Sequence, residues 1–274
     1  LFLALPAAGA APAKETAPPI PREWLTPAEA ADFRATPSYD ETLAFLKKIQ
    51  ERLPEMSLRF YGTSGEGRAM PLVIVSKEKV FSPEGDEAGE RDRGKNKDKD
   101  RDEEKEKKPV VLLQNSIHAG EIDGNDACLM LLRDWALGRR REILDAATIL
   151  ILPIYNVDGH ERVSPWNRPN QNGPVDGMGF RTTTSGLDLN RDHMKLESPE
   201  AQALIALVNA WHPDLHVDDH VTDGVDHDWV LTYSWAESPQ APAPVGDWLA
   251  AHMPAVLAAT EKAGHRVGPY VDLK

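Results

Sequence analysis

The sequence has very little cysteine and no surplus of positive charge. Cys128 is the single cysteine among 274 residues, so no disulfide can form within the chain. It lies in an apolar stretch, which predicts a buried structural thiol rather than a reactive one. Acidic residues outnumber basic ones by 44 to 31, for a formal net charge of -13. This balance argues against a nucleic-acid partner, which would need a basic face.

Long apolar runs are missing beyond the first residues. The run 1–13 reads LFLALPAAGAAPA and ends in small residues with A-x-A patterns, as the rear of a secretory signal peptide does. No later stretch is long and apolar enough to span a bilayer. We therefore predict that residues 1–21 are a signal-peptide remnant and linker, and that the protein is exported to the periplasm or secreted, without a membrane span.

A low-complexity tract interrupts the chain at 85–108. It consists almost entirely of Asp, Glu, Lys, Arg and Gly, and its charges nearly cancel. Without apolar residues it cannot contribute a core face, so we predict a solvated, disordered insertion. The chain as a whole is 41% hydrophobic, which suffices for one large α/β domain or two small ones. We predict a single domain over 22–274.

Apolar patterns predict strands that alternate with helices. The alternation indicates an α/β fold with a mixed, largely parallel sheet that carries helices on both faces. Short apolar runs predict strands at 58–61, 72–76, 110–113, 148–155 and 215–219. Helical periodicity and start signals predict helices at 39–53, 127–136 and 248–263. The run 198–200 predicts the start of a further helix, whose apolar face lies within 204–211.

Polar residues follow three of these strands directly. His118 and Glu121 come after the strand at 110–113, Asn156 after the next one, and His220 after the strand at 215–219. Ligands in open α/β sheets bind beyond the carboxyl ends of the strands. We therefore expect these side chains to meet at one edge of the sheet.

The spacing of His118 and Glu121 suits a metal. Three residues apart on a helical turn, both side chains lie on one face, where an imidazole and a carboxylate can bind one zinc ion. His220 is a candidate third ligand, and a catalytic site leaves the fourth position to water. Taken alone, H-x-x-E is also the pattern of a surface ion pair.

The order of several short blocks is more specific. Five of them follow one another: H-x-x-E at 118–121, N-x-D-G at 156–159, F-R at 180–181, D-L-N-R at 188–191 and D-x-H at 218–220. A Gly-Arg turn at 67–68 precedes them. This order resembles the carboxypeptidase A/B family of zinc metallopeptidases over roughly residues 39–223, and the expected fold is then that of the zinc carboxypeptidases.

The resemblance implies a ligand set. It makes His118, Glu121 and His220 the ligands of one zinc ion, and Asp188 the carboxylate that orients His118. His216 competes with His220, because strand alternation puts both on one face. His220 is preferred, since it stands at the exit of the strand and completes the D-x-H pattern.

The resemblance also implies substrate contacts. Asn190 and Arg191 would bind the free C-terminal carboxylate of a peptide or protein, a task that suits a guanidinium. Arg181 would polarise the scissile carbonyl, although Arg162 and Arg168 lie in the same long loop.

Two departures from the family pattern affect the substrate rather than the metal. Gly120 stands where many pancreatic-type members have arginine, which removes an outer substrate contact. Asp192 follows the N-R pair where many members have asparagine.

The family's general base is not evident. A tyrosine and then a catalytic glutamate follow the third ligand in that family, yet Glu237 and Glu261 are the only glutamates after His220. Neither has the expected context, and Tyr270 is weakly supported as the tyrosine. We therefore expect the chain to be the N-terminal two-thirds of a catalytic domain that assembles a zinc site and hydrolyses peptides poorly by itself.

The sequence thus predicts a zinc-dependent metallocarboxypeptidase. One alternative is a zinc amidase of the same architecture that acts on acylated amino acids or cell-wall peptides. An alternative from another class is a non-catalytic binding module that keeps the fold.

Overall fold

The computed structural model describes most of the chain in two compact units. The described residues are 18–83, 108–171, 173–222, 224–235 and 241–270. The predicted signal-peptide run and nearly all of the predicted charged insertion lie outside them. The units comprise 1–221 and 222–274, and each is described by itself.

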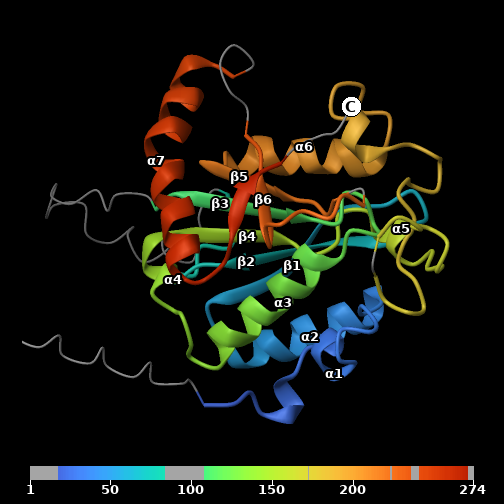
Figure 1. The fold of residues 1–274 in the computed structure, drawn as a ribbon, viewed down its shortest axis with the longest axis horizontal. Coiled ribbons are helices and arrows are strands. Elements are labelled where there is room, and N and C mark those ends of the chain that lie inside the picture. The colour runs from blue at the N-terminus through green and yellow to red at the C-terminus, as the bar shows by residue number, and fades with distance from the viewer. Residues whose placement is uncertain (1–17, 84–107, 172, 223, 236–240, 271–274) are drawn as a thin grey trace, which may run out of the picture. The chain divides into compact units, whose positions relative to one another are not determined.

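A five-stranded mixed sheet forms the centre of the first unit (Figure 1). The strand order is β1-β2-β4-β3-β5. β4, β3 and β5 are mutually parallel, whereas β2 pairs antiparallel with both β1 and β4. The strands are β1 (Met56–Thr63), β2 (Ala69–Val75), β3 (Val110–Asn115), β4 (Thr148–Leu152) and β5 (Leu215–Asp219). The predicted α/β fold with a mixed, largely parallel sheet is confirmed.

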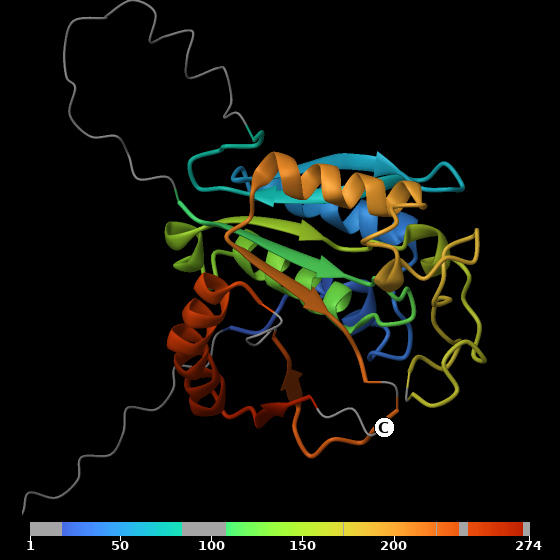
Figure 2. The same ribbon diagram turned by 90° about the horizontal axis from the view of Figure 1, so that it is seen from above.

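Helices cover both faces of this sheet (Figure 2). α2 (Tyr39–Arg52) and α3 (Asp123–Ala136) pack on one face, and their core cluster includes the fully buried Trp135. α6 (Pro199–Trp211) packs on the other, over a cluster that includes the buried Tyr155. The shorter helices are η1 (Arg22–Trp24), α1 (Pro27–Ala30), α4 (Ile143–Ala146), α5 (Val157–His160) and η4 (Leu189–Arg191).

Side-chain caps fix where α2 and α6 begin. Ser38 and Glu41 form a reciprocal capping box at the start of α2. The hydroxyl of Ser198 accepts a hydrogen bond from the Ala201 amide at the start of α6, where Pro199 is the first helical residue. The start predicted for this helix is therefore confirmed.

The turn between β1 and β2 is anchored on the N-x-D-G block. The Asp158 carboxylate accepts hydrogen bonds from the Ser64 hydroxyl at 2.8 Å, the Glu66 amide at 2.8 Å and the Arg68 guanidinium at 2.6 Å. The Thr184 hydroxyl lies 3.4 Å from the same carboxylate. The Asp158 side chain has no exposed surface. It anchors a hairpin on α5, and Glu66 and Asp158 are 92 positions apart in the sequence.

The parallel strands end at the same edge of the sheet. Gln114, near the end of β3, is in register with Leu152 of β4 and Asp218 of β5. β4 stops at Leu152, earlier than predicted, because Pro153 has no N–H to donate. The predicted meeting of three strand ends is found for β3, β4 and β5.

The second unit is small. A parallel pair of short strands, β6 (Leu231–Tyr233) and β7 (Val267–Pro269), accompanies the helix α7 (Ala243–Lys262). This helix begins five residues before the predicted start at 248. Within the residues that the structure describes, no helix combines the length and apolar character that a bilayer crossing needs.

Candidate metal centre

A tight turn after β3 presents two of the three candidate ligands. Ser116 takes up the left-handed region at φ 57°, which turns the chain away from the strand. The Glu121 amide then donates to the His118 carbonyl at 2.8 Å. The turn closes before α3 begins. A single turn, and not a longer helix, therefore brings His118 and Glu121 to the same side.

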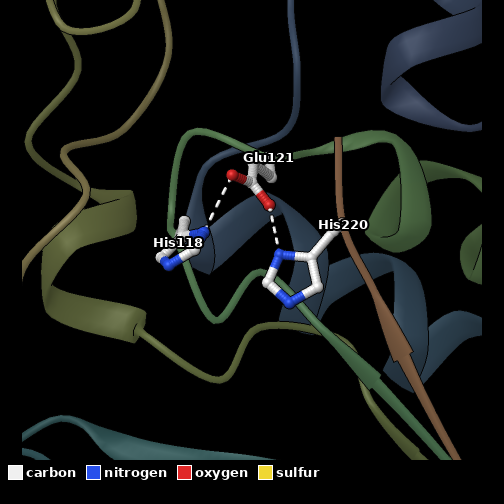
Figure 3. Close-up of side chains that lie close together, drawn as sticks. All are labelled: His118, Glu121 and His220. Carbon is white, nitrogen blue, oxygen red and sulfur yellow. Dashed lines mark hydrogen bonds and ion pairs between the residues drawn. The ribbon is translucent and has the colours of Figure 1, made fainter. Parts of the chain in front are cut away.

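The three predicted ligands converge in the structure (Figure 3). His118 Nδ1 lies 2.8 Å from Oε1 of Glu121, and His220 Nδ1 lies 2.8 Å from Oε2. One ligand atom from each residue falls within 4.8 Å of the others. His216, the competing histidine on the same strand face, does not belong to this cluster.

Each imidazole has a carboxylate on its far side. His118 Nε2 lies 3.4 Å from Oδ1 of Asp188, and His220 Nε2 lies 3.2 Å from Oδ2 of Asp218. A metal-bound histidine commonly has a carboxylate next to its second ring nitrogen, which fixes the tautomer and the ring orientation. The arrangement leaves both Nδ1 atoms to face the centre of the cluster.

Mutual hydrogen bonds set the charges of the triad. Burial alone would raise the pKa of Glu121, but hydrogen bonds from His118 and His220 hold that pKa well below its usual range. Burial lowers the pKa of His220, whereas Asp218 and Glu121 raise it, with a net pKa of about 10. The buried Glu121 carboxylate and the His220 imidazole therefore stabilise each other's charged forms.

The donor set fits zinc. Two imidazole nitrogens and one carboxylate oxygen form a common catalytic zinc set that leaves a position open for water. His118 and Glu121 are nearly buried, while the His220 side chain is 35% exposed, so solvent reaches the cluster from one side. His118 Nε2 is a buried nitrogen without a well-formed hydrogen bond, as the 3.4 Å separation from Asp188 implies.

Arg168, an alternative to Arg181 in the sequence analysis, contacts Glu121 of the triad. The guanidinium of Arg168 donates from Nη2 to Oε1 of Glu121 at 2.7 Å and from Nε to Gln171 at 2.8 Å. Its side chain is only 7% exposed. The glycine Gly120 makes room for it, because a Cβ there would lie 2.9 Å from Arg168 Cγ.

Arg181 is placed one step further from the triad. Its Nε donates to Oδ2 of Asp188 at 3.0 Å, and the Asn190 amide donates to Oδ1 of the same carboxylate at 3.0 Å. Asn156 holds the Arg181 carbonyl through its amide group at 3.1 Å. Asp188 therefore links His118 to Arg181, and the assignment of Arg181 to the scissile carbonyl stays a prediction.

The predicted carboxylate-binding pair lies on η4. Arg191 is exposed and its guanidinium donates to the neighbouring Asn190 carbonyl at 2.7 Å. Asp192, one of the two departures from the family pattern, is buried and accepts hydrogen bonds from the amides of Glu197 and Ser198. Asp192 therefore stabilises the approach to α6, and its side chain is committed to this role.

The chain is similar to known carboxypeptidases. A family model described as zinc carboxypeptidase matches residues 42–249. Among curated proteins, "Carboxypeptidase 2" of Trichophyton rubrum is 25% identical over 194 residues, which cover 69% of this chain and 30% of that protein.

Solved carboxypeptidase structures share the fold. A metallo-carboxypeptidase from Burkholderia cenocepacia matches with a TM-score of 0.58 and 22% identity, over 86% of this chain and 54% of that one. A carboxypeptidase A from Helicoverpa armigera matches with a TM-score of 0.54 and 16% identity, over 90% and 63%. The chain spans about half to two-thirds of these structures and less than a third of the curated relative.

Proposed function

We propose, from the premise that this chain belongs to the zinc carboxypeptidase family, that its protein is a zinc-dependent metallocarboxypeptidase acting at the free C-terminus of peptides. The convergence of His118, Glu121 and His220 carries the proposal. We also propose that the protein is exported, as the apolar run 1–13 predicts.

Each residue near the cluster has a proposed task. Bound zinc would supply a polarised substrate carbonyl and a water molecule of lowered pKa. Asp218 is hydrogen-bonded to the outer nitrogen of His220, and Asp188 lies beside that of His118. These carboxylates would keep the inner nitrogens directed at a bound ion. Asn190 and Arg191 would bind the terminal carboxylate of the substrate.

The acceptor of the water proton is not among the residues that we assign. Glu261 lies on α7 in the second unit, and Glu237 lies outside the described residues. The expectation that this chain hydrolyses peptides poorly by itself therefore stays a prediction. Metal binding is the sharper first test, since it does not depend on this glutamate.

Metal content tests the ligand set. We expect the purified protein to retain one zinc ion per chain after dialysis, and the single replacements His118→Ala, Glu121→Ala and His220→Ala to lose it. His216→Ala is the matched control on the same strand and should retain the ion. Stoichiometric zinc in the His220→Ala variant would refute the assignment.

Substrate choice tests the rest. In the full-length protein, Arg191→Ala should reduce cleavage of peptides with a free C-terminus far more than cleavage of C-terminally amidated ones. Equal losses on both substrates would make Arg191 structural. A panel of N-acyl amino acids and cell-wall peptides separates the amidase alternative, and zinc binding without turnover on either panel would favour the binding module.

A further inference from the structure

Arg168 contacts the triad directly, and contacts with Glu121, Gln171 and Gly120 hold its side chain in place. Nη2 contacts Glu121, Nε contacts Gln171, and the aliphatic stem passes over Gly120. With 7% of the side chain exposed, the guanidinium has lost most of its hydration. Such a cost is offset only where the hydrogen bonds are well formed.

The contact with Glu121 divides the carboxylate between its neighbours. Oε1 accepts from Arg168 and faces His118, whereas Oε2 faces His220 and the Val221 amide. A carboxylate oxygen has two lone pairs, so a hydrogen bond from Arg168 to Oε1 still allows this oxygen to bind a metal. The guanidinium therefore restricts rotation of the Glu121 carboxylate and leaves a lone pair of Oε1 available to a metal.

We propose that Arg168 is a positioning residue that orients Glu121 for the metal, and that Gly120 is small because the stem of Arg168 must pass over it. The inference rests on the proposed zinc site. It gives an arginine from the loop after α5 a role that neither the H-x-x-E spacing nor the resemblance assigned to it.

A purely electrostatic effect of Arg168 on zinc affinity would have the opposite sign to a positioning effect. A guanidinium beside a dication repels it, so removal of Arg168 would then tighten zinc binding. If orientation dominates, removal weakens binding, because losing a partner that orients a metal ligand typically costs about 10–100-fold in affinity. The sign of the change therefore separates a positioning role from a merely adjacent charge.

Gly120 offers a second, independent perturbation. A Cβ at this position would lie 2.7 Å from the Gly179 carbonyl and 2.9 Å from Arg168 Cγ. Both distances are too short for real contacts, so Gly120→Ala must displace the arginine as well as strain the backbone. Part of its effect should vanish once Arg168 is already absent.

The test measures zinc affinity by competition with a chromophoric chelator, for the parent protein, Arg168→Ala, Arg168→Lys, Gly120→Ala and the Gly120→Ala/Arg168→Ala pair. We expect Arg168→Ala to bind zinc about 10–100-fold more weakly. Arg168→Lys keeps the positive charge and a donor group but not the planar fork, and should lie between Arg168→Ala and the parent. Gly120→Ala should weaken binding in the parent and weaken it less in the Arg168→Ala background.

Controls exclude a general loss of structure. Arg162→Ala removes an exposed arginine of the same loop that pairs with Glu66, and it should keep the parent affinity. The visible spectrum of the cobalt-substituted protein reports ligand geometry, and it should change in Arg168→Ala but not in Arg162→Ala. If Arg168→Ala does not fold, the partial loss in Arg168→Lys carries the test.

Each outcome is decisive. Unchanged or tighter zinc binding by a folded Arg168→Ala variant would overturn the inference and leave the proposed zinc site intact. If turnover fell in that variant, the arginine would act on the substrate and not on Glu121. A parent protein that binds no zinc would refute the proposed function together with this inference.

Discussion

Asp158 offers a severe test of how the fold is held together. The replacement Asp158→Asn keeps the shape of the side chain but leaves it with one acceptor oxygen. In the parent, the two carboxylate oxygens serve Ser64 and Arg68 on one side and Glu66 and Thr184 on the other. The amide group must therefore face donors on one side.

The magnitude follows from what is left unpaired. Hydroxyls can rotate to accept from the new amide, but the backbone N–H of Glu66 and the guanidinium of Arg68 cannot. One of these loses its hydrogen bond to residue 158, and hydrogen bonds to charged groups contribute about 1.5–3 kcal/mol each. With the weakening of the remaining charge-assisted bonds, we expect the free energy of unfolding to fall by about 3 kcal/mol. For a unit of this size the melting temperature would drop by roughly 6–12 °C.

The assay is urea and thermal unfolding followed by tryptophan fluorescence. Asp145→Asn is the matched control, because Asp145 makes an ion pair with Lys77 that is largely exposed, and an exposed pair contributes little. If Asp158→Asn were no less stable than Asp145→Asn, the hairpin would not depend on the N-x-D-G block and our account of this junction would be wrong.

Three further predictions concern the core. Burial raises the pKa of Asp126 to about 7 despite a hydrogen bond from Thr36. The folded state therefore binds an extra proton, and its stability falls as pH rises from about 4 to 7. Asp126→Asn should remove that fall: it should raise stability at pH 8 by at most about 4 kcal/mol and change little at pH 4, and a gain at both pH values would contradict the assignment. Gly62→Ala would place a Cβ 2.5 Å from that of Ala203, and should cost about 1–3 kcal/mol in denaturant unfolding; an unchanged midpoint would mean that α6 can move away from β1. Burial raises the pKa of the Cys128 thiol to about 12, so it should react with a disulfide reagent only on unfolding, and rapid reaction in the native protein would show local opening.

The part of the site that sequence could predict depends on periodicity. β5 has the predicted bounds, and the predicted exits of β3 and β5 place His118 and His220 at one edge of the sheet. This worked because parallel neighbouring strands end together, and because a buried strand reads as an apolar run. The three-residue spacing of His118 and Glu121 needed only one turn of backbone, which local sequence determines.

The rest depends on loops whose course no pattern specifies. Arg181 and Arg168 lie in the same long irregular segment, and only packing decides that Arg168 reaches Glu121 while Arg181 pairs with Asp188. One signal could have been used: the glycine at 120, inside the H-x-x-E block, leaves space beside the ligand. The antiparallel placement of β2 next to β4 also has no local signature, since strand order is set by which apolar faces pack.

The pairing of β3 with β5 would make the proposed metal centre a reporter of correct folding. Asn115 lies opposite Asp219, so His220 leaves the sheet within reach of the turn that carries Glu121. A slip of one residue would turn every side chain of β5 to the opposite face and carry His220 away by about 3.3 Å. A misregistered chain could not assemble the ligand set. Zinc, by binding only the native pairing, would select it from compact alternatives.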